Sequence, residues 1–319
     1  MKMTNDKKIL IATGGTGGHI FPAYSLANNL INKKFLVDIV TDSRGYKFLK
    51  NYKNLRIKII ETYPIIKKTP LNFISSLIKL FISLIKALIY LKKTKPDVVF
   101  GMGGYSSFSI CLAAKILGIS FIIYENNLCV GKANRYLLPF TKKMFVGYGE
   151  VTGIKEKYRF KVVKTGNIIR QEILDYIPVK NFEAENKMNV LVLGGSQAAK
   201  SFGMHLPNIF KKCKNDKIPI KIYQQCLPEQ IKNLEVFYKK NQIEFELFHF
   251  TDNILKYFSI ANIVITRAGA SILAELINCK LPIISIPLPT SAENHQFQNA
   301  NYFLKKGYGY LIEEHDVIT

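Results

Sequence analysis

Short apolar runs alternate with longer helical patterns along the whole chain. The first run, Ile9 to Ala12, leads into the glycine-dense segment Thr13 to His19 and then into a helical pattern that opens at Pro22. The same succession of apolar run, glycine turn and helical pattern occurs in the second half, where Asn189 to Leu193 leads into the turn Gly194 to Gln197 and another helix. Strands and helices in alternation are typical of parallel sheets covered by helices. The pattern therefore predicts an α/β fold of two doubly wound, Rossmann-like parallel-sheet domains that face a cleft.

The remaining apolar runs and amphipathic stretches extend this pattern. Further strands are predicted at Phe35 to Val40, Leu55 to Ile60, Val98 to Phe100, Phe121 to Tyr124, Val162 to Val163, Ile220 to Gln224, Phe245 to Phe250, Ala261 to Thr266 and Ile283 to Ile286. Further helices are predicted at Leu71 to Leu91, Ser107 to Leu117, Glu229 to Lys240, Asn253 to Phe258 and Ser271 to Asn278. A polar loop containing Glu293, His295 and Gln296 follows the last strand. The weakly hydrophobic stretch Val179 to Lys187 follows the first half, and we place the boundary at Lys164, giving domains of residues 1–164 and 165–319.

The turn after the first strand holds four glycines in the five residues Gly14 to Gly18 and closes with His19. A strand, a glycine turn and a helix N-terminus together direct backbone N–H groups toward an anion or a sugar. A dinucleotide fingerprint is excluded because Ile20 or Pro22 stands where its third glycine belongs, and a P-loop needs glycine and lysine at His19 and Ile20. We interpret the turn as a ligand-facing loop. The alternative is a turn that serves only close strand-to-helix packing.

The most apolar segment is Leu71 to Leu91, which predicts a helix with one narrow polar stripe. The stripe consists of Asn72, Ser75, Ser76, Lys79, Ser83 and Lys86. A transmembrane span, a buried crossover helix and an interfacial membrane helix are the three candidate structures. The strands Leu55 to Ile60 and Val98 to Phe100 should lie in one parallel sheet, and a spanning helix would put them on opposite sides of a bilayer. We therefore favour an interfacial helix, flanked by Lys67, Lys68, Lys92, Lys93 and Lys95.

The net charge of +22 attracts anions, so nucleic acid, anionic lipid headgroups and a nucleotide diphosphate are all candidate partners. No helix-turn-helix, RNA-recognition or zinc-finger pattern accompanies the lysines, so we expect no nucleic-acid partner. The five cysteines are scattered without a C-x-x-C pair, which is typical of reduced thiols in the cytosol and gives no zinc site. No signal peptide is visible at the N-terminus, and no Asp-x-Asp motif occurs. We therefore expect neither a metal nor a cofactor.

Eight blocks of sequence carry a resemblance to a known family. They are GGTGGHIFPA at 14–23, GMGGY at 101–105, Glu125-Asn126-Asn127 with Gly131 and Asn134, GNIIR at 166–170, GGSQ at 194–197, FTD at 250–252, TRAGASILAE at 266–275 and HQFQNA at 295–300. In this order and spacing they resemble the MurG family of GT-B glycosyltransferases. The resemblance implies transfer of N-acetylglucosamine (GlcNAc) from UDP-GlcNAc to undecaprenyl-pyrophosphoryl-MurNAc-pentapeptide (lipid I), which forms lipid II in peptidoglycan synthesis. It also implies a peripheral enzyme at the cytoplasmic face of the cell inner membrane, in contact with anionic lipids.

The resemblance further implies binding residues in both halves. The first-domain contacts to the donor are Thr16, Gly17, Gly18 and Asn127. The diphosphate contacts are Arg170 and Ser196, and the uracil contact is the backbone of Thr251. The nucleotide pocket is lined by Ala270, Ser271, Ile272 and Glu275, the last accepting from both ribose hydroxyls, and the sugar is read by Gln296 with His295. Taken alone, Ser196 equally fits a helix N-cap, Glu275 a solvated helix face and Arg170 a surface salt bridge.

Inverting transfer to the MurNAc 4-hydroxyl needs a base that takes the hydroxyl proton. His19 is the candidate because an unperturbed imidazole titrates at about pH 6.5. The alternative base is Glu125, and the alternative role for His19 is to hydrogen-bond the diphosphate or brace the loop. Rival functions are another GT-B enzyme such as a UDP-GlcNAc 2-epimerase, which has no use for the Leu71 to Leu91 helix, and a non-catalytic membrane-bound UDP-sugar-binding protein. Family members continue past the position of Thr319, so we expect this chain to lack the family's last helices.

Overall fold

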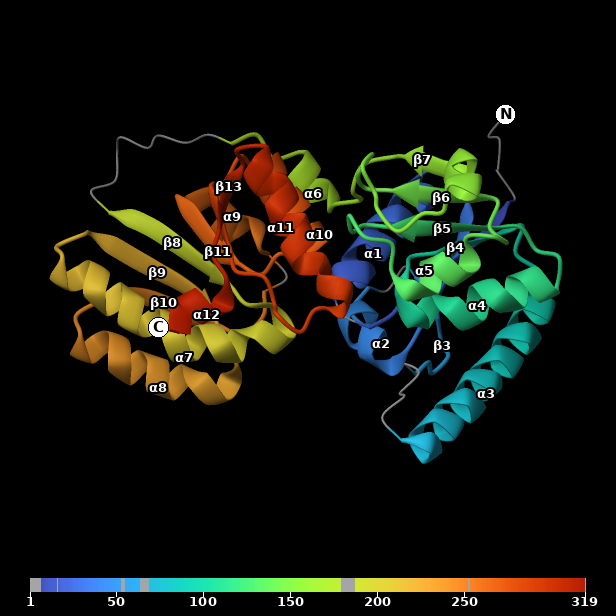
Figure 1. Ribbon diagram of the computed structural model, residues 1–319, viewed down its shortest axis with the longest axis horizontal. Helices are drawn as coiled ribbons and strands as arrows, with labels where there is room; N and C mark the ends of the chain where they lie inside the picture. The colour runs from blue at the N-terminus through green and yellow to red at the C-terminus, as the bar shows by residue number, and fades with distance from the viewer. Residues whose placement is uncertain are drawn as a thin grey trace. The chain divides into compact units, whose positions relative to one another are not determined.

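The computed structural model describes residues 7–15, 17–52, 55–63, 69–178, 187–251 and 253–318 (Figure 1). Two compact units make up the chain, the first ending at Arg170 and the second beginning at Gln171. Each unit is a parallel sheet with helices packed against it, which confirms the predicted α/β fold class. Lys164 ends the last strand of the first unit, and residues 165–170 belong to that unit as well.

The seven strands of the first sheet run parallel in the order β3-β2-β1-β4-β5-β6-β7. Their bounds are Lys8–Ala12 for β1, Leu36–Thr41 for β2, Arg56–Ile59 for β3, Val98–Gly101 for β4, Phe121–Glu125 for β5, Lys143–Val146 for β6 and Val162–Lys164 for β7. Strand β1 is an interior strand, because Ile9 pairs with Val37 on one side and with Val98 on the other. The carboxyl ends of β1, β2, β4 and β5 therefore meet at one edge, where open α/β sheets bind ligands.

The helices of the first unit follow these strands. They are α1 Gly17–Asn32, α2 Ser43–Leu49, α3 Pro70–Thr94, α4 Gly104–Ile116, α5 Lys132–Leu137 and the 3-10 helix η1 Glu156–Lys161. Helix α1 begins before its predicted opening at Pro22, so Gly17 and Gly18 form its first turn. Pro22 is buried inside this helix and has no N–H to donate to the carbonyl oxygen of Gly18.

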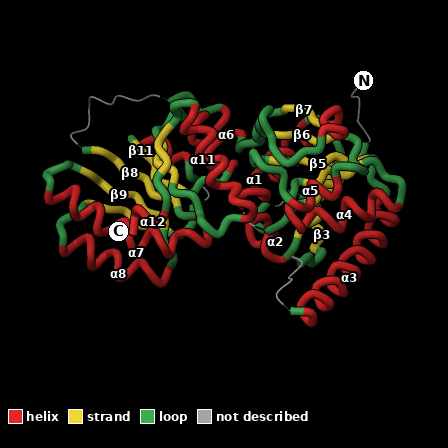
Figure 2. The backbone as a smooth tube through the Cα atoms, viewed as in Figure 1, coloured by secondary structure: helices red, strands yellow, loops and turns green. Residues whose placement is uncertain are grey.

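Helix α3 turns Ser76 and Ser83 inward and most of its large apolar residues outward. Ser76, Ser83 and Ala87 are buried, and the helix contacts α4, from which its N-terminal end diverges (Figures 1 and 2). The exposed apolar side chains are Leu71, Phe73, Ile74, Leu77, Ile78, Phe81, Ile82, Ile85 and Ile89. The predicted polar stripe therefore divides between two environments, since Ser76 and Ser83 face the protein whereas Lys79 and Lys86 are exposed. Small side chains on this side let the helix axis approach the rest of the unit closely.

Among the described residues, α3 is the one helix long and apolar enough to cross a membrane by length and composition. Strand β3 before it and strand β4 after it lie in the same parallel sheet, as predicted. Buried residues also recur along the helix from Ser76 to Leu91, so one side is packed on the protein over most of its length. We conclude that α3 is a crossover helix between two strands of one sheet.

The second sheet has six parallel strands in the order β10-β9-β8-β11-β12-β13. Its strands are β8 Met188–Leu193, β9 Ile220–Gln225, β10 Glu244–Phe248, β11 Ile263–Thr266, β12 Ile283–Ser285 and β13 Gly309–Leu311. The helices are α6 Gln171–Leu174, α7 Gly195–Asn215, α8 Pro228–Lys240, α9 Leu255–Ile260, α10 Ala270–Asn278, the 3-10 helix η2 Ala292–Asn294, α11 His295–Lys305 and α12 Glu314–Ile318. The polar loop predicted at His295 and Gln296 is wrong, because these two residues begin α11. Their polar composition hid the helix, whose buried side chains come later, at Asn299, Ala300 and Phe303.

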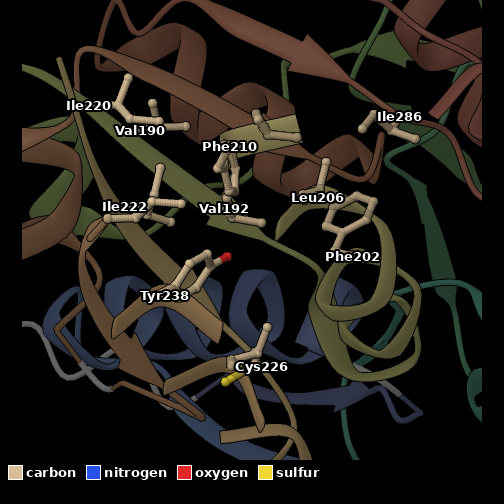
Figure 3. Close-up of a cluster of buried hydrophobic side chains, with 13 residues drawn as sticks. Val190, Val192, Phe202, Leu206, Phe210, Ile220, Ile222, Cys226, Tyr238 and Ile286 are labelled. Atoms are coloured by element: carbon tan, nitrogen blue, oxygen red, sulfur yellow. The ribbon is translucent and has the colours of Figure 1, made fainter. Parts of the chain in front are cut away.

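The core of the second unit lies between its sheet and helix α7. Side chains from β8 and β9, such as Val192 and Ile222, meet Phe202 and Phe210 from α7 (Figure 3). Tyr238 of α8 is fully buried there, and its hydroxyl hydrogen-bonds the Gln224 carboxamide at 2.5 Å. This packing fixes α7 on the sheet and so fixes the turn at its N-terminus.

Candidate active site

The glycine turn after β1 packs tightly against α2 and α4. Gly15 adopts a φ of 83°, and a Cβ atom on Gly14 would lie 2.6 Å from the side chain of Ser106. The Gly15 N–H donates to one oxygen of Asp42 at 3.2 Å, and the Ser106 hydroxyl donates to the other at 3.3 Å. Close packing at Gly14 thus coexists with an exposed Gly18 at the other end of the turn. Thr16 lies outside the described residues.

Asp42 is a residue of this site that the sequence analysis missed. Its carboxylate caps α2 through the Gly45 N–H at 2.8 Å and pairs with the guanidinium of Arg44, which lies over the ring of Tyr105. Burial raises the pKa of Asp42, but the hydrogen bonds from Arg44, Gly45 and Gly15 outweigh burial and hold that pKa below its usual value. The available signal was position, because Asp42 directly follows the carboxyl end of β2.

His19 lies in the first turn of α1, with its imidazole ring against the backbone after β4. A Cβ atom on Gly103 would lie 3.5 Å from Cε1 of the ring, and one on Gly104 would lie 3.5 Å from Nε2. Both glycines have positive φ, 88° and 69°, a region that disfavours other residues. The side chain of His19 is only partly buried. The second glycine block therefore provides the surface on which the imidazole rests.

Asn126 connects the end of β5 to the glycine turn. Its Nδ2 donates to the carbonyl oxygen of Gly18 at 3.2 Å, the group to which Pro22 cannot donate. Asn126 is itself buried. The hydrogen bond therefore holds Gly18, the residue next to His19, from the segment that follows β5.

Glu125 is buried, with 3% of its surface exposed, and its carboxylate accepts four hydrogen bonds. Oε1 accepts from the backbone N–H of Asn127 at 3.1 Å and from its Nδ2 at 2.9 Å. Oε2 accepts from the Gly131 N–H at 2.9 Å and from Nδ2 of Asn134 at 3.0 Å. The carboxylate thus holds the loop from Asn127 to Asn134 in one conformation.

Arg170 belongs to the first unit, where its guanidinium lies 5.2 Å from the ring centroid of Phe21 in α1. The preceding segment is tied to β5, because the Tyr124 hydroxyl donates to Asn167 at 3.1 Å and accepts from the Ile168 N–H at 2.9 Å. The structure therefore brings Arg170 to the helix that also carries Gly17, Gly18 and His19.

In the second unit, the turn after β8 presents the N-terminus of α7. Gly195 has a φ of 63°, and its N–H donates to Oε1 of Gln225 at 3.2 Å. The side chain of Ser196 lies outside the described part of the chain. Thr251 lies before α9, and its hydroxyl accepts from the Asn253 N–H at 3.1 Å. Asp252 lies outside the described residues.

The predicted nucleotide residues lie on α10, which begins directly after Gly269. Ala270 is buried and Ser271 and Ile272 are partly buried. Glu275, one turn later, has 5% of its surface exposed. Glu275 therefore does not lie on a solvated face of the helix.

Gln296 and His295 begin α11 and are both partly buried. The Leu288 N–H donates to Oε1 of Gln296 at 3.0 Å, and Nδ1 of His295 lies 2.8 Å from the Ala292 carbonyl oxygen. Glu293 and Asn294, just before the helix, have positive φ values of 52° and 55°. This tight entry orients the first turn of α11.

Within the described residues, no group of three or more His, Cys, Asp or Glu side chains is arranged to hold a metal ion. The polar groups at the carboxyl edges of the two sheets are instead glycine-turn amides, amide side chains, hydroxyls, single carboxylates and arginines. Such groups suit a ligand with phosphate and hydroxyl groups.

The chain matches two known domains in succession. Residues 9–146 match the glycosyltransferase family 28 N-terminal domain, and residues 189–319 match the glycosyltransferase family 28 C-terminal domain. The chain belongs to glycosyltransferase family 28. A relative in Pelagibacter ubique (strain HTCC1062) is 35% identical over 98% of this chain and 86% of its own length. That relative is named UDP-N-acetylglucosamine--N-acetylmuramyl-(pentapeptide) pyrophosphoryl-undecaprenol N-acetylglucosamine transferase.

Solved structures agree with this family 28 assignment. The crystal structure of Acinetobacter baumannii MurG has a TM-score of 0.75 and 26% identity, over 97% of this chain and 86% of that one. The predicted resemblance to the MurG family is therefore confirmed. A UDP-N-acetylglucosamine 2-epimerase has a TM-score of 0.62 at 12% identity, over 98% of this chain and 85% of that one, and so shares the fold alone.

Proposed function

We propose that this chain is an inverting glycosyltransferase that moves GlcNAc from UDP-GlcNAc to the MurNAc 4-hydroxyl of lipid I, forming lipid II. The observation that carries this conclusion is the 35% identity, over 98% of the chain, to a relative that bears the name of this enzyme. The rival epimerase function has the support of a shared fold at 12% identity. It also leaves the exposed apolar face of α3 without a use.

For donor binding, the second unit offers the N-terminus of α7 as an anion site and Glu275 as a carboxylate acceptor. The N-terminus of α7 carries a partial positive charge that suits a diphosphate and, during transfer, the growing charge of the leaving UDP. Glu275 can accept from two vicinal ribose hydroxyls, as carboxylates do in dinucleotide sites. Thr251, Ala270, Ser271 and Ile272 are proposed to line the nucleotide pocket, and Gln296 with His295 is proposed to read the sugar. From the first unit, Thr16, Gly17, Gly18, Asn127 and Arg170 are the proposed donor contacts.

His19 is our proposed general base. Its imidazole is partly exposed, and its ring lies against the backbone of Gly103 and Gly104 at the carboxyl edge of the sheet. The four hydrogen bonds to the Glu125 carboxylate favour a positioning role for that residue, because both of its oxygens already accept from donors of the loop. In the proposed step His19 takes the proton of the 4-hydroxyl while the oxygen attacks the anomeric carbon and the bond to UDP breaks.

The acceptor carries a polyprenyl chain, and α3 supplies the surface that we propose docks on its membrane. Phe81 and Ile78 expose 61% and 55% of their surfaces, and their apolar neighbours continue the same face. Exposed apolar patches of this kind mark interaction sites. Lys92 and Lys93 in the last turn add positive charge suited to anionic headgroups. Peripheral docking at the cytoplasmic face of the inner membrane follows from this proposal.

The test is a transfer assay with radiolabelled UDP-GlcNAc and a lipid I analogue in anionic vesicles. We expect label to move into the lipid fraction, and His19→Ala to slow that transfer. An epimerised nucleotide sugar without labelled lipid would support the epimerase instead. Binding of UDP-GlcNAc with neither product would leave a non-catalytic UDP-sugar-binding protein.

A further inference from the structure

An ion pair between a buried arginine and a partly buried glutamate connects to the start of α11 and uses residues that the donor site does not. Arg267 follows β11 with 6% of its surface exposed, and its Nη2 pairs with Oε1 of Glu314 in α12 at 2.5 Å. Ser201 of α7 donates its hydroxyl to the same carboxylate oxygen. The Arg267 guanidinium also lies 4.6 Å from the ring centroid of Phe202. One guanidinium therefore connects three separate segments of the second unit.

The other arm of this guanidinium holds the chain after β12. Nη1 donates to the carbonyl oxygens of Ile286 at 3.0 Å and Pro287 at 3.1 Å. The peptide group of Pro287 continues into the N–H of Leu288, and that N–H donates to Oε1 of Gln296 at 3.0 Å. A single peptide plane thus accepts from Arg267 at one end and donates to Gln296 at the other. Hydrogen bonds in such a chain polarise and strengthen one another.

We propose that Arg267 and Glu314 are positioning residues that fix the carboxamide orientation of Gln296, so that this side chain meets the donor sugar as a hydrogen-bond donor. A backbone N–H can only donate, so the Gln296 atom that faces Leu288 is the oxygen. The Nε2 end then remains for the ligand and matches an acceptor such as a hydroxyl or acetamido oxygen of an N-acetylhexosamine. This inference rests on the proposed function, which assigns sugar reading to Gln296.

Charge explains why an arginine and a glutamate are suited to this task. Burial raises the pKa of Glu314, but the hydrogen bonds from Ser201 and Arg267 and the arginine charge hold it below its usual value. The carboxylate is therefore ionised at neutral pH and offsets the charge of the buried guanidinium. The planar guanidinium fork can hold Glu314 and two carbonyl oxygens at once, which the single ammonium of lysine does less rigidly.

The test is a double-mutant cycle on donor affinity. We would measure the Kd of UDP-GlcNAc and of UDP by calorimetry for wild type, Arg267→Lys, Glu314→Gln, Gln296→Ala and each pair with Gln296→Ala. We expect Arg267→Lys and Glu314→Gln to weaken UDP-GlcNAc binding about three- to tenfold while UDP binding changes less than about twofold. In the Gln296→Ala background the same changes should have almost no further effect. Glu244→Gln, which breaks an exposed ion pair with Lys187, is the matched control.

Two outcomes overturn the proposal. One is an equal loss of UDP and UDP-GlcNAc affinity, which assigns the pair a purely structural role, and the other is full additivity with Gln296→Ala. If Arg267→Lys fails to fold, Glu314→Gln and the milder Ser201→Ala carry the same test. A wild type that binds no UDP-GlcNAc would instead contradict the proposed function, and this result appears before any variant is made.

Discussion

Asn126 donates a hydrogen bond of 3.2 Å to the carbonyl oxygen of Gly18, four residues before Pro22 in helix α1. A proline has no N–H, so the helix cannot satisfy this carbonyl in the usual way. The side chain from β5 supplies a donor, and it does so immediately beside His19. The location of the proposed base therefore depends on β1, on β5 and on helix α1.

The first prediction concerns His19. His19→Ala should retain UDP-GlcNAc affinity and lose about 10²–10⁴-fold in turnover, the usual contribution of a general base. Calorimetry with the donor and an initial-rate transfer assay measure the two quantities separately. Loss of donor affinity with little change in turnover would instead place His19 at the diphosphate.

The second prediction concerns Glu125. Glu125→Gln keeps the shape of the side chain but replaces one acceptor oxygen with an NH₂ group. That NH₂ group would face N–H donors of the loop, so the substitution should lower the free energy of unfolding by about 1–3 kcal/mol. Turnover should fall as well, yet the acidic limb of the pH–rate profile should persist, because His19 is still present. Urea unfolding and a pH series measure both effects. Disappearance of that limb would identify Glu125 as the base.

The third prediction concerns the ribose contact. Glu275→Ala should weaken UDP-GlcNAc binding by about 1.5–3 kcal/mol, the scale of hydrogen bonds to a charged acceptor. Glu275→Gln is the matched variant, since it keeps one acceptor oxygen and should lose less. Unchanged donor affinity in a folded Glu275→Ala protein would remove this residue from the site.

The fourth prediction concerns α3. Replacing Ile78, Phe81 and Ile85 with Ser should weaken binding to anionic vesicles at least about tenfold, because each apolar side chain buried in lipid contributes roughly 1 kcal/mol or more. These three side chains are exposed, so their replacement should leave the fold intact. Leu84 is left unchanged because it is partly buried. Vesicle sedimentation and circular dichroism check both points. Ser75→Ala is the control on an exposed polar position, and equal sedimentation of all variants would contradict docking through α3.

The fifth prediction concerns acid stability. The pKa of Glu314 is lower in the folded protein than its ordinary value of 4.5, so its ionised form stabilises the fold above that value. This contribution is lost as the pH falls through the lowered folded pKa. Glu314→Gln should therefore reduce the acid-induced loss of stability below about pH 4.5. Thermal unfolding at pH 7 and at pH 3.5 compares the slopes, and parallel slopes would exclude a role for this carboxylate.

The sequence allowed prediction of most strands and of the site edge, because both depend on local patterns. An apolar run such as Ile9 to Ala12 predicts a buried parallel strand. Polar residues after such a run, including His19 and Glu125, fall at the carboxyl edge by the same rule. The parallel arrangement of β3 and β4 followed from the connection between them.

The features that were missed depend on contacts between distant segments. Periodicity groups Ser76 with Lys79 on α3, but only the tertiary packing of this helix decides that the serine is buried and the lysine exposed. Likewise, the pairing of Arg267 with Glu314 joins residues 47 positions apart. No spacing rule connects two such residues, so their part in the site appears only in three dimensions.

The outward apolar face of α3 also has a consequence for handling the purified protein. In lipid-free buffer this face meets only water, so two copies gain free energy by covering it with each other. Apparent size in solution should then rise with protein concentration and fall on addition of a mild detergent, because micelles compete for the same side chains. An oligomeric state measured without lipid would therefore include self-association through the α3 face.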